Sequence, residues 1–193
     1  LTGTVYRHYL QEAFDERPVS IANTGNSATE ATVTLTGIPA TPPAASDNGL
    51  AIERSYYGID GEPASLEAVR QNNRFVVVLS VRPTQLGSGS YLIVDPLPAG
   101  FEIENPDLSQ AGGVGELGWI SVNTPTHVES RTDRYVAAFR YTSPVEAFST
   151  AYMVRATAPG NFVLPGATAE DMYRPEFRGN TAAGAIEVKT AGP

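Results

Sequence analysis

The chain has 193 residues, of which 41% are hydrophobic and 18% charged, and its net charge is −8 at pH 7. This composition is typical of a folded domain with a packed core rather than of a disordered chain. The negative charge and the single lysine, Lys189, argue against nucleic acid or an anionic membrane surface as a partner, because both are bound through clustered Lys and Arg. Without cysteine, the chain forms no disulfide, thiolate nucleophile or zinc–sulfur site.

The N-terminal part has the pattern of a β-hairpin. Arg17–Asn23 and Ala31–Gly37 alternate apolar and small polar residues on either side of the turn TGNSATE. The tract Ile38–Gly49 follows, rich in Pro, Ala, Ser and Asn, and predicts a linker with a domain boundary near residue 43. The first residues show no signal-peptide pattern and are interpreted as a start inside a longer protein.

The second block, residues 44–193, has the pattern of an antiparallel β-sandwich of six or seven strands. In the strand predicted over Leu50–Gly58, we expect Leu50, Ile52 and Tyr56 to face one way. Arg74–Pro83 is an almost unbroken apolar, β-branched run, which is typical of a central strand covered on both faces. Further strands are predicted in the segments YLIVDPLP, RYVAAFRYTS, FSTAYMVRATAPGNFVLPG (with a hairpin turn at TAPGNF) and AIEVKT.

One short helix is expected at most, in the segment NPDLSQAGG. Asn105 has the character of an N-cap, and Pro106 suits the first helical position. No apolar run in the sequence reaches the roughly 18 residues of a membrane-spanning helix.

The sequence shows no catalytic or metal-binding set. His8 and His127 are far apart, and neither has a second ligand at a metal-site spacing. The carboxylates Glu102, Glu104 and Asp107 are interpreted as a solvated strand face rather than as a glycosidase acid pair. The pair Glu170–Asp171 lacks the further oxygen ligands that calcium requires. No catalytic residues, metal or cofactor are therefore predicted, and we expect the protein not to be an enzyme.

Trp119 follows the glycine-rich segment GGVGELG, which lacks the Lys-Ser/Thr of a phosphate-binding loop and is interpreted as a flexible loop. Trp119 is interpreted as a core anchor rather than as a platform for sugar binding. One interpretation of the function is therefore a generic bacterial surface β-sandwich that binds carbohydrate or protein. An exposed stripe of aromatic residues that includes Trp119 would favour carbohydrate binding. This interpretation is the alternative to the family resemblance described next.

The order of motifs in residues 44–193 resembles the C-terminal end of bacterial α2-macroglobulins. The resemblance rests on NGLAIERSYYGIDG, RFVVVLSV, YLIVDPLPAGFEIENPDL and YMVRATAPGNFVLPGATAEDMYRPEFRGNT, of which the last is the most specific. It implies an all-β fold, namely a macroglobulin-like (immunoglobulin- or fibronectin-like) sandwich equivalent to the receptor-binding domain of animal homologues. Residues 1–43 resemble the second half of the CUB domain that follows the thioester domain in this family.

The resemblance implies that the parent protein is a periplasmic endopeptidase inhibitor, often anchored as a lipoprotein, that traps host or competitor proteases in bacterial defence. A thioester elsewhere in such a parent captures the protease covalently. This chain has no cysteine and hence no thioester. The resemblance therefore implies a module that packs on the thioester domain of the same polypeptide, without cofactor, membrane contact or nucleic acid.

The resemblance also assigns a role to the segment GATAEDMYRPEFRGNT. A Met–Tyr pair of this domain covers the thioester in the family, and Met172 and Tyr173 stand at the matching positions. The residue pattern alone favours packing of this pair on the domain's own core, whereas the resemblance favours an apolar lid and predicts an unusually exposed Tyr173. Further contacts with the thioester domain are expected from four neighbours: Arg174, Pro175, Phe177 and Arg178.

Overall fold

A computed structural model describes residues 21–32, 34, 43–84, 88–104 and 117–192. The chain separates into two units, Leu1–Ile38 and Pro39–Pro193. In the first unit, the described residues are exposed and include no strand. Asn23 closes a bend there, because its side chain accepts from the backbone N of Gly25 at 2.9 Å and donates to the backbone O of Ser27 at 2.8 Å.

The predicted N-terminal hairpin is therefore not seen in the described parts of Arg17–Asn23 and Ala31–Gly37, which bury none of the apolar face that such a hairpin needs. The rest of that hairpin, and His8, lie outside the described residues. The CUB-like half-domain over residues 1–43 stays a prediction.

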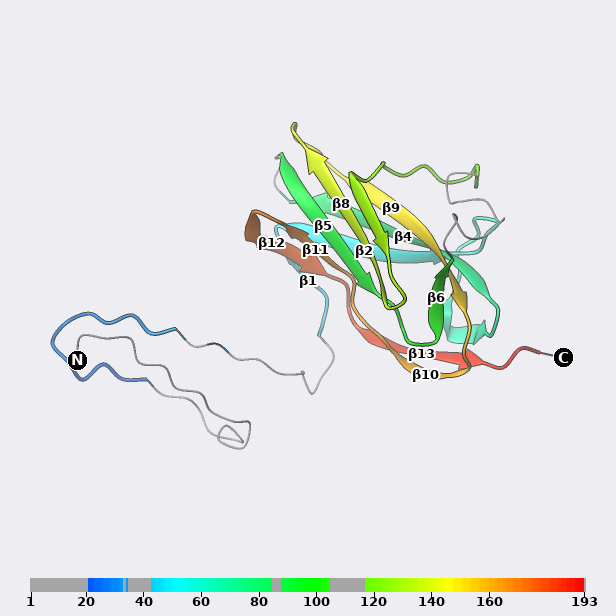
Figure 1. Cartoon of the computed structure of the whole chain (residues 1–193), viewed down its shortest axis with the longest axis horizontal. Helices are drawn as coiled ribbons and strands as arrows, with labels where there is room; N and C mark the ends of the chain where they lie inside the picture. Colours follow the sequence, from blue (N-terminus) through cyan, green and yellow to red (C-terminus); the bar gives the residue numbers. More distant parts are fainter. Residues whose placement is uncertain (1–20, 33, 35–42, 85–87, 105–116, 193) are drawn as a thin grey trace. The chain divides into compact units, whose positions relative to one another are not determined.

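The second unit is built from three sheets (Figure 1). The six-stranded sheet has the order β1 (Ser46–Asn48), β12 (Arg174–Asn180), β11 (Thr168–Asp171), β5 (Gly89–Pro96), β8 (Arg134–Tyr141), β7 (His127–Ser130). The four-stranded sheet has the order β2 (Leu50–Tyr57), β4 (Arg74–Pro83), β9 (Phe148–Ala156), β6 (Phe101–Glu104). The three-stranded sheet has the order β10 (Gly160–Leu164), β13 (Gly184–Lys189), β3 (Val69–Arg70).

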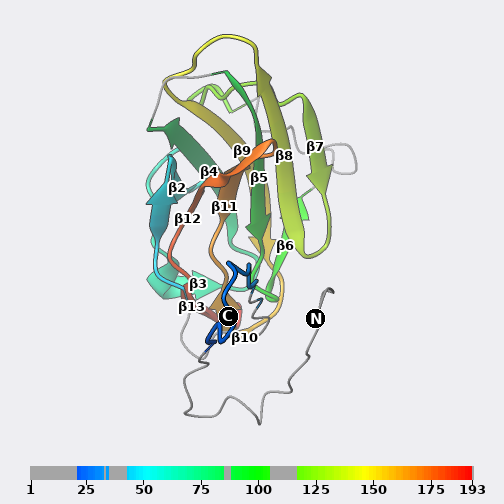
Figure 2. The ribbon, with the colours of Figure 1, turned by 90° about the vertical axis from the view of Figure 1, so that its left-hand side faces the viewer.

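The two larger sheets form two layers, and β10, β13 and β3 lie together at one end of them (Figure 2). All strand pairs are antiparallel except β13 with β3. The predicted all-β sandwich is thus confirmed. A single 3₁₀ turn, Leu66–Ala68, is the one helical element in the described part of the chain, and nothing there is long and apolar enough to cross a membrane as a helix. The helix predicted at Asn105 lies outside the described residues.

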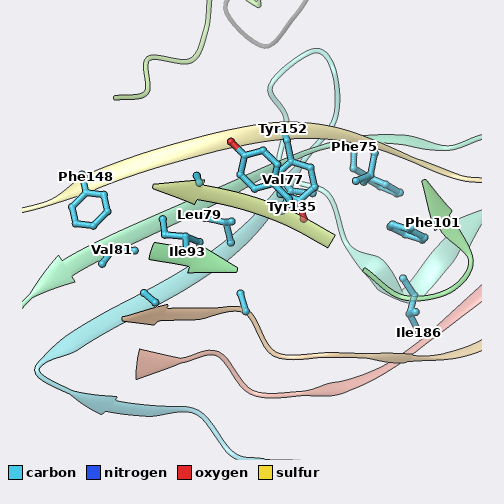
Figure 3. Close-up of a cluster of buried hydrophobic side chains, with 14 of the residues drawn as sticks. Phe75, Val77, Leu79, Val81, Ile93, Phe101, Tyr135, Phe148, Tyr152 and Ile186 are labelled. Atoms are coloured by element: carbon cyan, nitrogen blue, oxygen red, sulfur yellow. The ribbon is translucent and has the colours of Figure 1, made fainter. Parts of the chain in front are cut away.

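The core lies between the two larger sheets (Figure 3). Val77, Leu79 and Val81 project from β4 toward this core, where they meet Ile93 of β5. Val76 of the same strand is also fully buried, so β4 is covered on both faces there, as its unbroken apolar run predicts. Leu50, Ile52 and Tyr56 of β2 pack on this core, which confirms the face predicted for that strand.

The hairpin predicted at TAPGNF is wrong. β9 belongs to the four-stranded sheet and β10 to the three-stranded sheet, so the turn carries the chain from one sheet to another. The backbone N–H groups of Thr157 and Ala158 both donate to the carbonyl of Gly100, at 2.8 and 3.3 Å. These bonds divert the chain away from β9 before it could fold back on that strand. The end of the predicted linker also differs, because Ser46–Asn48 forms β1.

Candidate contact site at the β11–β12 hairpin

The segment Gly166–Thr181 contains a hairpin that is built into the six-stranded sheet. On one side, β11 pairs with β5 in a register that places Asp171 opposite Tyr91. On the other side, β12 pairs with β1, with Asn180 opposite Ser46. The pairing with β5 therefore supports the hairpin up to its apex, whereas β1 supports the other end of β12 (Figure 1).

The apex consists of two residues, Met172 and Tyr173, between the paired residues Asp171 and Arg174. Met172 is 52% exposed and Tyr173 is 82% exposed, which places two large apolar side chains in solvent. The exposure expected for Tyr173 is thus confirmed, and packing of this pair on the domain's own core is not observed. The lid role itself stays a prediction.

Asp171 shapes the apex. One of its carboxylate oxygens, Oδ1, accepts hydrogen bonds from the backbone N of Tyr173 at 3.0 Å and from that of Arg174 at 3.2 Å. An Asp side chain that accepts from the backbone two residues onward is a common way to fix a tight turn, and it explains why this sequence turns here. The backbone N of Met172 donates to Ser90 O at 2.8 Å, which ties the apex to β5.

The second oxygen of Asp171 forms an ion pair. Its Oδ2 accepts from Arg174 Nε at 2.9 Å and from Nη2 at 2.6 Å, and the same Nη2 donates to Ser88 O at 3.0 Å. Asp171 is 1% exposed, so this charge is buried against its partner. The hydrogen bond to Asp171 and its negative charge raise the pKa of Arg174. Burial, followed by the charge of Asp171, raises the pKa of the neighbouring Tyr91.

Asp171 is therefore committed within its own domain. Both of its carboxylate oxygens accept hydrogen bonds from this chain, so they are not offered to a cation. In the part of the chain that the structure describes, no group of three or more His, Asp or Glu side chains could hold a metal ion.

The other predicted contact residues follow the apex. The register moves from Glu170 opposite Arg178 to Asp171 opposite Arg174, so the segment Pro175–Phe177 forms a bulge in β12. A proline is tolerated in a bulge because no ladder hydrogen bond is required of it. The bulge presents Pro175 to solvent, and Arg178 beyond it is exposed as well.

Phe177 turns back toward its own domain. Its ring packs on Gly49, where a Cβ would overlap the ring, and φ at Gly49 is +87°. The guanidinium carbon of Arg174 lies 5.1 Å from the centroid of the same ring. Arg174 and Phe177 thus hold contacts within this domain, and any contact that they make with a neighbouring domain comes in addition to these.

Those of the remaining candidates that lie in the described part of the chain do not converge on a site. His127 lies exposed on β7, and Asp107 falls outside the described residues. Glu102 is exposed, whereas Glu104 is half-buried and its carboxylate pairs with Arg74, with an Nε–Oε2 distance of 2.8 Å. Of the two carboxylates that the structure describes, Glu104 is thus held in an ion pair and Glu102 faces solvent.

Trp119 is not the core anchor that the sequence predicts. Its side chain is 38% exposed, and its Nε1 donates to Ile59 O at 2.9 Å. The indole packs on Gly61 and lies 5.5 Å, centroid to centroid, from the ring of Tyr57. Trp119 therefore caps a surface turn, where Ile59 O supplies the acceptor that its N–H needs.

A buried charged cluster escaped the sequence analysis. Arg54 of β2 and Asp95 of β5 form an ion pair, and Tyr152 of β9 donates to the same carboxylate at 2.8 Å. Burial raises the pKa of Asp95, and the adjacent Arg54 opposes that rise. One signal was available, because Arg54 shares the strand face of Leu50, Ile52 and Tyr56. The cluster lies between the two sheets, away from the apex.

The fold and the site together define a class of protein: an antiparallel, macroglobulin-like β-sandwich that presents two apolar side chains at the apex of a supported hairpin. Residues 49–176 match the family of the bacterial alpha-2-macroglobulin MG10 domain. The chain belongs to this family, as the sequence resemblance predicts.

Two curated relatives and a solved structure agree with this assignment. Alpha-2-macroglobulin of Escherichia coli (strain K12) is 32% identical over 174 residues, which cover 86% of this chain and 10% of the relative. Alpha-2-macroglobulin of Xylella fastidiosa (strain Temecula1 / ATCC 700964) is 33% identical over 171 residues, with 84% and 10% covered. Native alpha-2-macroglobulin from Escherichia coli, in a crystal structure that spans domain MG7 to the C-terminus, superposes with a TM-score of 0.67 and 33% identity, covering 79% of this chain and 25% of that chain. The chain thus spans about one tenth of the length of the curated relatives it matches.

Proposed function

We propose that this chain is a module of a periplasmic, α2-macroglobulin-like protease inhibitor, and that its Met172–Tyr173 apex covers a thioester on the neighbouring thioester domain of the same polypeptide. The exposure of Tyr173, at 82%, carries the proposal. A large apolar ring that its own domain leaves exposed to solvent is typical of a surface that binds a partner. Family membership supports the nature of that partner, and the whole inhibitor acts on host or competitor proteases.

The chemistry of a thioester explains why such a cover is useful. Water or an amine that reaches the thioester carbonyl destroys the bond before any protease is met. An apolar cover excludes both nucleophiles from the site. A tyrosine ring buries roughly 150–250 Å² when it is enclosed, and the flexible thioether of a methionine fills irregular gaps beside it. Met172 and Tyr173 together have the shape and polarity for this task.

The test uses the intact parent protein with Tyr173→Gly. The expected result is faster incorporation of methylamine, because the amine then reaches the thioester without a protease. Val163→Gly is the matched control, since Val163 is also an exposed apolar residue but lies on β10, in another sheet. Equal incorporation rates in Tyr173→Gly and the wild type would contradict the proposal.

The carbohydrate-binding alternative has weaker support in the structure. Trp119 and Tyr57 are neighbouring aromatic residues, but one side of the indole is occupied by Gly61 and its N–H is bound to Ile59 O. A sugar platform needs an open ring face and free polar groups around it. We therefore retain the inhibitor module as the proposed function.

A further inference from the structure

We infer that Asp171 and Arg174 are positioning residues: they hold the Met172–Tyr173 apex in its contact conformation before any partner binds. This inference rests on the proposed function for the partner's identity, but the positioning itself is a property of this chain. The inference starts from two side chains that lie only two residues apart. Asp171 has a buried carboxylate, whereas Tyr173 is the most exposed aromatic side chain of the described residues.

The backbone of the apex is fully hydrogen-bonded on its donor side. The N–H of Met172 is bound to Ser90 O, and those of Tyr173 and Arg174 are bound to Asp171 Oδ1. No N–H of the apex is therefore left to solvent, and each of these bonds restrains the backbone torsions of the turn. The side chains of Met172 and Tyr173 are free while the backbone that carries them is fixed.

The carboxylate of Asp171 is held from a second direction. Arg174 bonds to Oδ2 through two nitrogens and to the O of Ser88, the residue before β5, so one guanidinium joins the turn to the segment that leads into the neighbouring strand. A two-nitrogen contact of this kind adds geometric specificity to the charge pair. A Cβ added to Gly89 would lie 3.1 Å from Asp171 Oδ2, so the carboxylate sits directly against the β5 backbone. This fit leaves little space for the carboxylate to move.

On its other side, Arg174 contacts the ring of Phe177, which rests on Gly49 between β1 and β2. The path from Asp171 through Arg174 and Phe177 therefore connects the apex to Ser88, just before β5, and to Gly49, between β1 and β2. An element that is ordered before binding loses less conformational entropy on contact. We therefore expect the Met172–Tyr173 apex to fit the thioester domain better and to leave the thioester uncovered less often.

The first experiment measures the apex in the 193-residue chain itself. Backbone NMR order parameters of Met172, Tyr173 and Arg174 are expected near 0.85 in the wild type and below about 0.6 in Asp171→Ala. Asp171→Asn keeps an oxygen acceptor for the two N–H groups but loses the charge pair, so intermediate values are expected. Glu170→Ala is the matched control, because Glu170 precedes Asp171 on the same strand and is exposed on the other face. Unchanged order parameters in Asp171→Ala would overturn the inference.

The second experiment uses the intact parent. Asp171→Ala is expected to speed methylamine incorporation by roughly tenfold or more, because it removes all four hydrogen bonds to the Asp171 carboxylate, and the loss of even one charge-assisted hydrogen bond corresponds to about this factor. In a background that carries both Met172→Ala and Tyr173→Gly, the same change is expected to add nothing, because a positioning residue acts only through the side chains that it positions. An equal acceleration in both backgrounds would show a merely structural effect and overturn the inference.

The two experiments separate the two proposals. If Tyr173→Gly leaves the methylamine rate unchanged, the thioester cover fails, and the order parameters alone decide whether Asp171 positions the apex. Where Asp171→Ala does not fold, Arg174→Gln replaces it, since it keeps the turn bonds to Oδ1 and removes the charge pair together with the guanidinium contacts to Ser88 O and Phe177. Arg174→Lys, which keeps the charge without the planar fork, is expected to restore the order parameters in part.

Discussion

Arg54 Nη1 lies 2.6 Å from Asp95 Oδ1, and this ion pair joins the four-stranded sheet to the six-stranded sheet through the core. The two side chains are 5% and 1% exposed. Tyr152 donates to the second oxygen of Asp95 at 2.8 Å, and Arg54 Nη2 donates to Pro165 O at 2.8 Å. Every buried side-chain N or O atom in the described residues has a hydrogen-bond partner, so the cluster is closed.

Removal of one member of this cluster is expected to be costly. Asp95→Ala leaves the guanidinium of Arg54 and the hydroxyl of Tyr152 buried without their acceptor. We expect the free energy of unfolding to fall by about 3–5 kcal/mol, as for other buried pairs that lose one partner. Urea unfolding of the chain measures this change. Asp133→Ala is the control, because it removes an exposed ion pair with Arg134 and is expected to leave the unfolding midpoint unchanged.

The same cluster permits a compensating experiment. When Arg54→Met, Asp95→Leu and Tyr152→Phe are combined, no charge or hydroxyl of these three residues remains buried. An apolar replacement of this kind is often neutral or stabilising relative to the ion pair. The triple variant is expected to unfold close to the wild-type midpoint. A triple variant as unstable as Asp95→Ala would show that the loss comes from packing rather than from the unpaired charge.

The sequence predicted the strands and their buried faces, but it did not predict the ion pair between Arg54 and Asp95. The alternation along β2 and the apolar run of β4 identified strands and buried faces correctly, because burial imposes a period on each strand by itself. The same alternation puts Arg54 on the core face. The sequence could not predict Asp95 as the partner of Arg54. Asp95 lies on a strand of another sheet, and no local sequence pattern indicates which strands face each other.

The candidate site shows the same limit. The exposed Met172 and Tyr173 were found through the resemblance of their segment to a family. Asp171 was considered only as a calcium ligand, although its turn-forming role is local chemistry that an Asp before a two-residue apex can indicate. For Trp119, the size and apolarity of the side chain favoured a place in the core. In the structure, its indole N–H instead bonds to Ile59 O at a surface turn.

The buried tyrosines predict alkaline instability. Burial raises the pKa of Tyr56, Tyr135 and Tyr152 above the ordinary value of 10.0, and the charge of Asp95 adds to the rise at Tyr152. The folded state then keeps protons that the unfolded state releases above pH 10. The contribution to stability is therefore full below that pH and is lost as the pH rises. Each such tyrosine lowers the free energy of unfolding by about 1.4 kcal/mol per pH unit in this range.

Tyrosinate absorbance and circular dichroism, followed together in a pH titration, check this expectation. Ionisation of the three buried tyrosines is expected to coincide with unfolding rather than to precede it. Tyr56→Phe, at a residue with no side-chain hydrogen bond among the described contacts, should reduce the slope of stability against pH by one proton. Ionisation of all tyrosines in a chain that stays folded would contradict the prediction.

Gly61 beneath Trp119 predicts a local effect on a single fluorophore. A Cβ at Gly61 would lie 2.8 Å from the indole, and φ there is +90°, a region that other residues adopt only with strain. Gly61→Ala is expected to cost about 1–3 kcal/mol and to release the indole from its turn. Because Trp119 is the one tryptophan in the sequence, acrylamide quenching of its fluorescence reports that release directly. Gly184→Ala is the matched control, because a Cβ added there would meet no atom within 4 Å, and it should quench like the wild type.

Gly49 supports the apex from a distance through Phe177. A Cβ at this position would overlap the Phe177 ring, and φ is +87°, so Gly49→Ala meets both a steric and a backbone penalty. We expect a loss of about 1–3 kcal/mol in urea unfolding from the backbone penalty alone, with the displaced ring adding to it. Gly49→Ala combined with Phe177→Ala removes the overlap but not the backbone strain, so the second change should cost less in this background than alone. Strict additivity of the two changes would contradict a direct contact between them.

Because Arg174 lies over the same ring, Phe177→Ala is also expected to lower the backbone order parameter of Tyr173, which Gly184→Ala should leave unchanged.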